Sequence, residues 1–323
     1  MEDTKPLVSF IIPAHNVPPA MLRKCIESIL ALSLRAFERE IIIIDYSSSD
    51  CPLLDGLGEL ADETIYIRQR NADVSVARNT GMQMATGRFM QFVGGDSRLI
   101  KAPYEHVLDH LRYGQSDMVL FDYSKTADAP LLYDDQGPMT GSEMLRCENI
   151  RGSAWGYVFS RSIAGSLRFT PGMNYGEDKE FTPQLMLRAE NVVRTTAKAY
   201  FYRQKPPTAN GTQSIRSHIR RLEDSRSVIM RLKKIAVRLP AADKPAMQRY
   251  VALLTMDYIY NIIVTTGSSH YLERKIGELG KAGLFPLPDR NYTTKYTWFR
   301  RMANSRAGRA VLLKSLPVME GER

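Results

Sequence analysis

Residues 75–97, SVARNTGMQMATGRFMQFVGGDS, decide the fold of this chain. They predict a helix that opens at Arg78–Asn79, a short turn, and a buried strand from Arg88 to Val93. A single carboxylate, Asp96, follows the end of that strand. In an open α/β sheet, ligands bind outside the carboxyl ends of the strands. Asp96 is therefore a candidate ligand-binding residue, although Gly-Gly-Asp is also ordinary turn chemistry.

Two earlier apolar runs end in the same way. Residues 7–12 lead into Pro13 and Asn16, and residues 41–44 lead into Asp45. Near-continuous aliphatic runs of this length are typical of strands buried on both faces of a parallel sheet. Residues 19–34, between them, have apolar positions at helical spacing. This alternation predicts right-handed βαβ units in one sheet, with three polar strand ends along one edge.

Five segments in a fixed order resemble the family 2 glycosyltransferases with the GT-A fold, most of all the bacterial enzymes that extend capsular and other surface polysaccharides. The segments are VSFIIPAHN, IIIIDYSSSD, NADVSVARNTGMQMATGRFMQFVGGDS, SAWGYVFSRS and NYGEDKEF. Each alone would be a weak signal, but together they are specific. The resemblance covers about residues 7–215. It implies an α/β fold, with a Rossmann-like mixed sheet flanked by helices as a catalytic domain over residues 1–215.

Composition limits the remaining possibilities. A chain of 323 residues with 44% apolar residues can build one full catalytic domain and a smaller appendage. The polar start of the chain does not resemble a signal peptide, and no stretch is long and uncharged enough to span a bilayer. Three widely separated cysteines, with no metal-type pairing, fit a reduced compartment. The chain is therefore expected to be cytoplasmic.

The net charge of +9 is unevenly distributed. Residues 216–323 hold 21 Lys and Arg against 9 Asp and Glu, a balance of +12, so residues 1–215 carry −3. Helical spacing in 217–237 and 245–263 predicts that this C-terminal region is a basic helical appendage. Two interpretations stay open: peripheral contact with the inner face of the cell membrane, and plain packing of solvated helices. No nucleic-acid module is recognisable, so no nucleic-acid partner is expected.

The resemblance implies a nucleotide-sugar site at the strand ends. It assigns donor contacts to six residues: Pro13, Asn16, Asp45, Arg78, Asp96 and Arg203. Asp45 would accept from the imide N–H of uracil, which favours a UDP-sugar. Arg78 can orient a carboxylate or a diphosphate, or can simply pair with Asp73 or Asp96. The Pro- and Gly-rich residues 204–212 are expected to close over the diphosphate as a lid.

Asp96 is also the expected metal ligand. The family usually has Asp-x-Asp at this strand end, and its last carboxylate binds a divalent cation; here Gly94 replaces the first Asp. Mn²⁺ or Mg²⁺ is the expected cofactor, because such ions are commonly bound by one or two carboxylates together with phosphates and waters. Tyr46 and Tyr157 are two further departures from the family pattern, which usually has Asp and often has Lys at these positions.

A second acidic cluster, GEDKEF at 176–181, places Glu177 and Asp178 in the first turn of a predicted helix. Acidic residues there stabilise the helix dipole whatever else they do. The resemblance implies that Asp178 is the general base that takes the proton of the acceptor hydroxyl, with inversion at the anomeric carbon. It also implies acceptor contacts for Trp155 and Glu177, although a tryptophan is equally common in a core.

These observations favour an inverting, metal-dependent glycosyltransferase in surface polysaccharide synthesis. It would move a sugar from a UDP-sugar to a glycan acceptor, which is expected to be lipid-linked. Two alternatives remain. One is a non-catalytic relic that binds a sugar nucleotide or glycan, motivated by Gly94, Tyr46 and Tyr157. The other is a membrane-associated assembly subunit that recruits a partner through its basic region. An intact GEDKEF segment is the main argument for catalysis.

Overall fold

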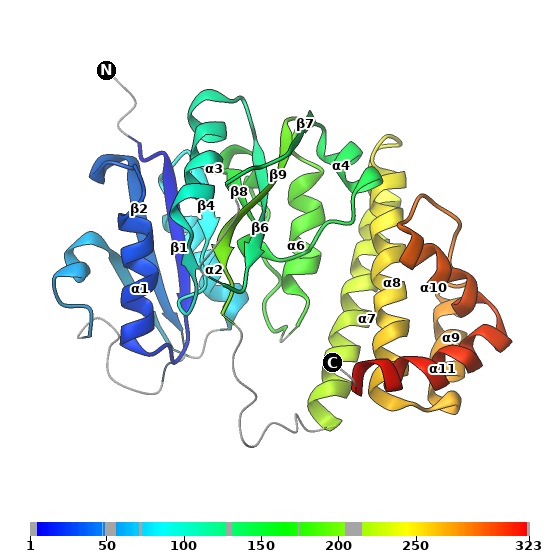
Figure 1. The fold of residues 1–323 in the computed structure, drawn as a ribbon. Coiled ribbons are helices and arrows are strands. Elements are labelled where there is room, and N and C mark those ends of the chain that lie inside the picture. Colours follow the sequence, from blue (N-terminus) through cyan, green and yellow to red (C-terminus); the bar gives the residue numbers. More distant parts are fainter. Residues whose placement is uncertain are drawn as a thin grey trace. The chain divides into compact units, whose positions relative to one another are not determined.

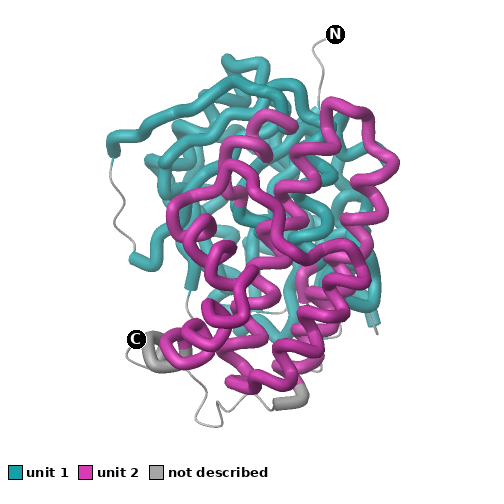
Figure 2. Tube along the Cα trace, turned by 90° about the vertical axis from the view of Figure 1, so that its right-hand side faces the viewer, with its two compact units in different colours: residues 1–141, 151–173, 177–208 teal, residues 142–150, 174–176, 209–323 magenta. Residues whose placement is uncertain are grey.

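The computed structural model describes residues 5–46, 48, 56–70, 73–126, 131–173, 175–203 and 215–321. They belong to two compact units, coloured separately in Figure 2. The first unit comprises residues 1–141, 151–173 and 177–208, and the second comprises residues 142–150, 174–176 and 209–323.

A mixed sheet forms the centre of the first unit (Figure 1). Its strands are β1 (Val8–Ala14), β2 (Arg39–Tyr46), β3 (Ile65–Gln69), β4 (Phe89–Phe92), β5 (Arg98–Leu99), β6 (Met118–Ser124), β7 (Asp135–Met139), β8 (Tyr157–Ser160) and β9 (Val192–Phe201). The strand order is β3-β2-β1-β4-β8-β6-β9-β5, and β7 pairs with β9. β3, β2, β1 and β4 are mutually parallel, whereas β8 runs antiparallel to β4 and β6. The predicted parallel βαβ arrangement is confirmed.

Helices cover both faces of this sheet. They are α1 (Pro19–Leu30), α2 (Val74–Met84), α3 (Lys101–Tyr113), α5 (Arg161–Ala164) and α6 (Glu177–Met186). Apolar side chains of α1 and α3 share one core with Phe10 and Ile12. Because alternate residues of a strand point to opposite faces, Ile11 faces the other side, where Gly81 of α2 packs on it. A Cβ at Gly81 would come within 2.2 Å of the Ile11 Cγ2 atom.

Two predicted helix boundaries were wrong. The helix expected to open at Arg78–Asn79 begins at Val74, one turn earlier, because Asp73 caps it by accepting a hydrogen bond from the Val76 N–H at 2.8 Å. The helix predicted over 19–34 ends at Leu30. The first change matters for function, because Arg78 then lies inside a rigid helix instead of at its start.

The second unit is helical, as predicted. It contains α4 (Gly141–Cys147, whose first residue belongs to the first unit), α7 (Ile215–Arg238), α8 (Lys244–Thr266), α9 (Ser269–Lys281), α10 (Thr294–Asn304) and α11 (Arg306–Gly321). α7 packs along α8, which also contacts α9, α10 and α11. The buried Arg249 of α8 donates to the Leu145 and Glu148 carbonyls at 2.9 and 2.8 Å. These bonds fix residues 142–150 to the helices.

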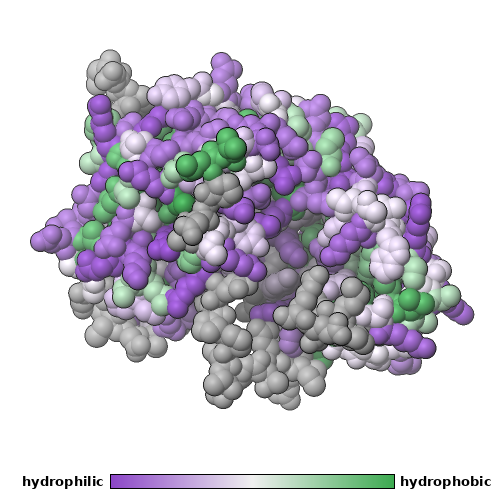
Figure 3. Space-filling view, in the orientation of Figure 1, coloured by the Kyte–Doolittle hydropathy of each residue, from purple (hydrophilic) through white to green (hydrophobic). Residues whose placement is uncertain are grey.

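One face of the protein shows how polar and apolar residues are distributed. The face seen in Figure 3 is mostly hydrophilic, with hydrophobic residues in small, separate patches. Within the described residues, none of the helices has the length and apolar character needed to cross a bilayer.

Candidate active site

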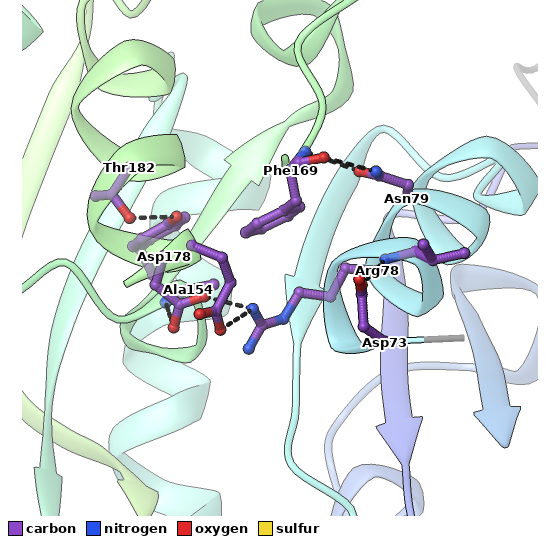
Figure 4. A network of polar contacts seen from close by, with 10 residues as sticks. Asp73, Arg78, Asn79, Ala154, Phe169, Asp178 and Thr182 are labelled. Carbon is purple, nitrogen blue, oxygen red and sulfur yellow. Dashed lines mark hydrogen bonds and ion pairs between the residues drawn. The ribbon is translucent and has the colours of Figure 1, made fainter. Parts of the chain in front are cut away.

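An arginine and two acids form the centre of the candidate site (Figure 4). Arg78 reaches from α2 to the first turn of α6, where its Nη1 lies 2.9 Å from Glu177 Oε1 and 2.5 Å from Asp178 Oδ1. The second oxygen of Asp178 accepts from the Ala154 N–H at 3.2 Å. All three side chains are largely buried: Arg78 is 11% exposed, Glu177 12% and Asp178 19%. Neither of the alternative partners predicted for Arg78, Asp73 or Asp96, is the one observed.

Burial changes the acidity of Asp178. Removal from water raises the pKa of this carboxyl from 3.8 to about 6, and the negative charge of Glu177 adds to the rise. The Arg78 cation and the Ala154 N–H act in the opposite direction. Asp178 is therefore ionised at neutral pH, yet its pKa lies close enough to the working range for proton transfer.

The surroundings of Arg78 hold its guanidinium in place. Its guanidinium carbon lies 5.0 Å from the ring centroid of Phe169 and 5.9 Å from that of Phe92. The next residue, Asn79, clamps the backbone of Phe169 from both sides, with Nδ2 donating to the carbonyl at 2.9 Å and Oδ1 accepting from the N–H at 2.8 Å. Figure 4 shows this clamp between α2 and the Phe169 segment. Asn79 thus positions the aromatic ring beneath Arg78.

Tyr157, which departs from the family pattern, is part of the same support. Its ring is buried, and its hydroxyl lies 3.0 Å from the Thr182 hydroxyl on α6. Thr182 is one helical turn beyond Asp178, so this contact holds the end of α6 that carries the acids. Tyr157 is a packing residue that positions the site.

The ends of β1 and β2 form the second part of the site. Asp45 is fully buried. Its Oδ2 accepts from the Tyr66 hydroxyl at 2.6 Å and lies 3.7 Å from Arg68 Nε, whereas its Oδ1 has no hydrogen-bond partner among the described residues. Beside it, the rings of His15 and Tyr46 stack at 5.2 Å, and His15 Nδ1 lies 2.8 Å from the Tyr46 carbonyl. An unpaired buried carboxylate oxygen carries a desolvation cost, which a donor on a ligand would remove.

Pro13 and Asn16 lie at and just after the end of β1. Pro13 is half-buried and pairs with Ile44 in the sheet. Asn16 is exposed and adopts a left-handed backbone with φ of 49°, which asparagine tolerates better than most residues. Its N–H donates to the Ser48 hydroxyl at 3.1 Å. The loops after β1 and β2 are therefore tied together.

The end of β4 forms the third part of the site. Asp96 and Arg203 line one pocket of about 240 Å³, together with Met21, Lys24, Ser97, Arg98 and Phe201. Gly94, where the family usually has its first acid, donates its N–H to the Tyr200 hydroxyl at 2.9 Å. A Cβ at Gly94 would lie 3.2 Å from that hydroxyl and 3.3 Å from Ser97 Oγ. A side chain at position 94 would therefore be in tight contact with a buried tyrosine hydroxyl.

Trp155 lies within a cluster of aromatic rings. Its indole stacks on Tyr200 and Tyr202, with centroid distances of 4.6 and 5.6 Å, and Tyr123 meets it edge-on at 5.4 Å. Trp155 itself is half-buried, whereas Tyr202 is 40% exposed. The ring of this cluster most open to solvent is therefore that of Tyr202.

A series of contacts joins the first and third parts of the site. Asp96 follows Gly94, which bonds to Tyr200; Tyr200 stacks on Trp155; and Ala154, the residue before Trp155, donates to Asp178. The ends of β1, β2 and β4 lie along one edge of the sheet, because these strands are parallel neighbours. Residues 204–212, expected to form a lid, lie outside the described residues.

Sequence reasoning missed three tyrosines of this region. Tyr66 donates to Asp45, while Tyr200 and Tyr202 stack on Trp155. The alternation of Tyr200 and Tyr202 in the sequence puts both rings on one side of the chain at the end of β9. The sequence alone could have shown this alternation. It could not have shown that both rings stack on Trp155, which lies some 45 residues earlier in the chain.

Comparisons with known proteins bear on the family and the fold. Residues 9–161 match the family model described as Glycosyl transferase family 2. The uncharacterized glycosyltransferase EpsJ of Bacillus subtilis is 27% identical over 223 residues, which are 62% of this chain and 62% of EpsJ. The poly(ribitol-phosphate) beta-N-acetylglucosaminyltransferase TarP of Staphylococcus aureus is 21% identical over 202 residues, 60% of this chain and 62% of TarP. Each match spans less than two thirds of the relative.

Among solved structures, residues 1–349 of S. aureus TarS in complex with UDP-GlcNAc resemble this chain with a TM-score of 0.65 and 14% sequence identity. The superposition covers 95% of this chain and 88% of that one, so the likeness includes the C-terminal helices. The expected GT-A architecture with a helical appendage is confirmed. Residues 9–161 therefore match the glycosyl transferase family 2 model, within a chain that has a GT-A fold.

Proposed function

We propose that this protein is an inverting glycosyltransferase that moves a sugar from a UDP-sugar to a glycan acceptor in surface polysaccharide synthesis. The observation that carries the proposal is Asp178, a buried acid with a pKa of about 6, held by Arg78 and a backbone N–H at a helix start. An acid with a purely structural role would stabilise the fold more if its pKa were low, because the ionised form of a buried acid with a raised pKa opposes folding at neutral pH. A group poised in this way suits a general base.

Donor recognition rests on Asp45. Its unpaired Oδ1 would accept the imide N–H of uracil, and the Tyr66 hydroxyl holds the other oxygen, which fixes the direction of the carboxylate. The stacked pair of His15 and Tyr46 offers an aromatic edge beside it. Pro13 and Asn16 are proposed to border the nucleoside. The UDP-GlcNAc in the TarS structure supports a uridine nucleotide.

The pocket at Asp96 is proposed to hold the diphosphate. The residues fit Mn²⁺ or Mg²⁺, because Asp96 and the neighbouring Ser97 hydroxyl are oxygen donors, the ligand type that these ions prefer. A bound ion would neutralise charge that develops on the departing diphosphate. Arg203 and Lys24 line the same pocket, and their positive charges would also stabilise the negative charge on the departing diphosphate.

At the acceptor, Asp178 would take the proton of the attacking hydroxyl. Attack opposite to the leaving diphosphate inverts the anomeric carbon. Arg78 is a positioning residue here: it orients Asp178 and favours its ionised form. Trp155 and Glu177 are proposed acceptor contacts, with Tyr202 as the exposed ring of the aromatic cluster.

The basic helical region over 216–323 is proposed to act beside a catalytic domain over 1–215. The compact units support a boundary in this part of the chain, since residues 177–208 belong to the first unit and residues 209–323 to the second, although residues 142–150 and 174–176 also belong to the second. A lipid-linked acceptor at the inner membrane face would account for the +12 balance of the region. α10 supports this in detail, because Trp298 is 49% exposed and lies between the exposed cations Lys295 and Arg301.

The test is UDP release from a panel of UDP-sugars, with membrane extract as acceptor source, in the presence and absence of Mn²⁺ or Mg²⁺. Wild type is compared with Asp178→Asn and with a control, Asp62→Asn, which changes an exposed carboxylate. Metal-dependent release that is lost only in Asp178→Asn supports the proposal. Donor binding without release in the presence of acceptor would establish the non-catalytic alternative, and the absence of binding would overturn the donor assignment.

A further inference from the structure

A cluster of two histidines and an aspartate lies outside the candidate active site. His106 and His110 are four residues apart on α3, so both imidazoles lie on one side of that helix. Both His Nε2 atoms lie 3.0 Å from Asp135 Oδ2, at the start of β7. α3 and β7 are labelled in Figure 1, and all three residues belong to the first unit.

The chemistry of this cluster is that of a transition-metal site. One ligand atom from each residue can be chosen so that all three lie within 4.8 Å of one another. In a tetrahedral zinc site with bonds of about 2.0–2.1 Å, ligand atoms lie about 3.3 Å apart. The two nitrogen–oxygen separations of 3.0 Å are close to this value. Two imidazoles and a carboxylate suit Zn²⁺, whereas Mg²⁺ and Mn²⁺ prefer all-oxygen sites.

A residue of the neighbouring strand orients the aspartate. Asp135 pairs with Thr195 of β9 across the sheet, and the buried Thr195 hydroxyl bonds its carboxylate. Such second contacts orient a ligating carboxylate and raise metal affinity. The ring of Tyr133 packs against His106 with a centroid distance of 4.9 Å, which restricts one imidazole.

The cluster is also accessible. The side chains of His106, His110 and Asp135 are 29, 23 and 32% exposed. An ion could enter from solvent, and water would complete its coordination. Three protein ligands with an open position are a common zinc arrangement.

We propose that His106, His110 and Asp135 bind one Zn²⁺ ion at a site separate from the proposed cation site at Asp96. The ion would link α3 to β7. This proposal does not rest on the transferase activity, because its readout is binding. Without an ion, the same side chains form a hydrogen-bonded cluster in which the carboxylate accepts from both imidazoles.

The test is a Zn²⁺ titration of the chelator-treated full chain by calorimetry, with Co²⁺ absorption as a report of coordination. Wild type is expected to bind one equivalent. The double variant His106→Gln/His110→Gln and the variant Asp135→Asn are expected to bind at least ten-fold more weakly. Thr195→Val is expected to lose about 10- to 100-fold in affinity through the second contact.

Two controls make the result specific. His270→Gln removes an exposed histidine elsewhere and should bind Zn²⁺ as wild type does. Asp96→Asn should also retain Zn²⁺ binding while it changes the proposed donor site. Zn²⁺ should raise the unfolding temperature of wild type but not of the double variant. Equal affinity in wild type and the double variant, or weak binding of several ions in both, would overturn the proposal.

Discussion

Asp178 is controlled by three neighbours with opposing effects. Burial and Glu177 favour its neutral form, while Arg78 and the Ala154 N–H favour its charge. A carboxyl whose pKa is raised in the folded state contributes stability at low pH that is lost as pH rises through its folded pKa. At neutral pH the ionised Asp178 therefore opposes folding. The proposed activity requires Asp178 to be ionised, whereas the stability of the fold favours its neutral form.

The first prediction concerns the pH dependence of turnover. If Asp178 is the base, kcat should rise as pH passes through about 6, because the acid must be ionised. Arg78→Lys keeps the charge and should leave this midpoint near wild type. Arg78→Met removes the cation and should move the midpoint to higher pH, by roughly 1 unit or more. Steady-state rates from pH 5 to 9 give the midpoint for each variant. An unchanged midpoint in Arg78→Met would count against Asp178 as the base.

The second prediction concerns stability at the same residues. Arg78→Met leaves two buried carboxylates unpaired and should lower the free energy of unfolding by roughly 3–5 kcal/mol. Arg35→Gln, at an exposed arginine, should change it by less than about 0.5 kcal/mol. Asp178→Asn should lose activity and should lose less stability than Arg78→Met. It removes a buried charge, although its amide can accept only one of the two hydrogen bonds that Asp178 accepts. Urea unfolding at pH 7 measures all three variants, and a large loss in Asp178→Asn would assign Asp178 a structural role.

At the scale of elements, the site depends on α2, α6 and the strand ends being held at fixed positions. Asn79 joins α2 to the Phe169 segment, and Tyr157 joins β8 to α6. These contacts place a guanidinium from one helix against carboxylates from another, 99 and 100 residues apart in the chain. The precision of the site therefore comes from residues that do not contact substrate.

The third prediction tests the clamp by Asn79. Asn79→Ala leaves a backbone N–H and a carbonyl of Phe169 unpaired, each at a cost of about 1–3 kcal/mol. Asn79→Asp keeps the acceptor, but its second oxygen would face the Phe169 carbonyl oxygen, so it should not recover the loss. Chemical denaturation gives the two free energies. Stability close to that of wild type in either variant would contradict the clamp.

The fourth prediction tests the replacement of the family acid at the end of β4. Gly94→Ala should destabilise the fold by about 1–3 kcal/mol, because its Cβ would press on the Tyr200 hydroxyl and Ser97. Removing that hydroxyl with Tyr200→Phe should recover part of the loss in the double variant. Gly277→Ala is the matched control: its Cβ would meet nothing within 4 Å, and alanine favours a helix. Additive losses at positions 94 and 200 would contradict the direct contact.

At the scale of the whole molecule, charge and chemistry are divided along the chain. The acids and aromatic rings of the candidate site belong to the first unit, while the excess of cations belongs to residues 216–323. In that region Trp298 and Val311 are 49 and 50% exposed among basic residues. Anionic lipid attracts each cation near its surface by about 1 kcal/mol.

The fifth prediction follows from this division. The full chain should sediment with vesicles that contain anionic lipid and not with neutral ones, and salt should weaken the binding. The triple variant Lys295→Glu/Arg301→Glu/Arg306→Glu should lose most of it. A control triple change of exposed cations in the first unit, at Arg35, Lys101 and Lys125, should retain it. Equal loss in both triple variants would indicate general electrostatics instead of a membrane-binding face.

The sequence by itself determined the sheet, the parallel βαβ units, the helical appendage and the residues at each strand end. It could do so because hydrophobic periodicity is local, and because Asp45, Asp96 and Asp178 lie within short motifs. It placed the start of α2 too late, since the capping acid Asp73 precedes the motif.

Only the tertiary structure decided the partners. Arg78 pairs with acids 99 and 100 residues away, Tyr200 fills the space beside Gly94, and His106 and His110 meet Asp135 across two elements. Each of these contacts depends on strand order and helix packing, which local patterns do not encode. Burial decided the chemistry as well: the pKa of Asp178 and the unpaired oxygen of Asp45 arise from removal of water by residues distant in the chain.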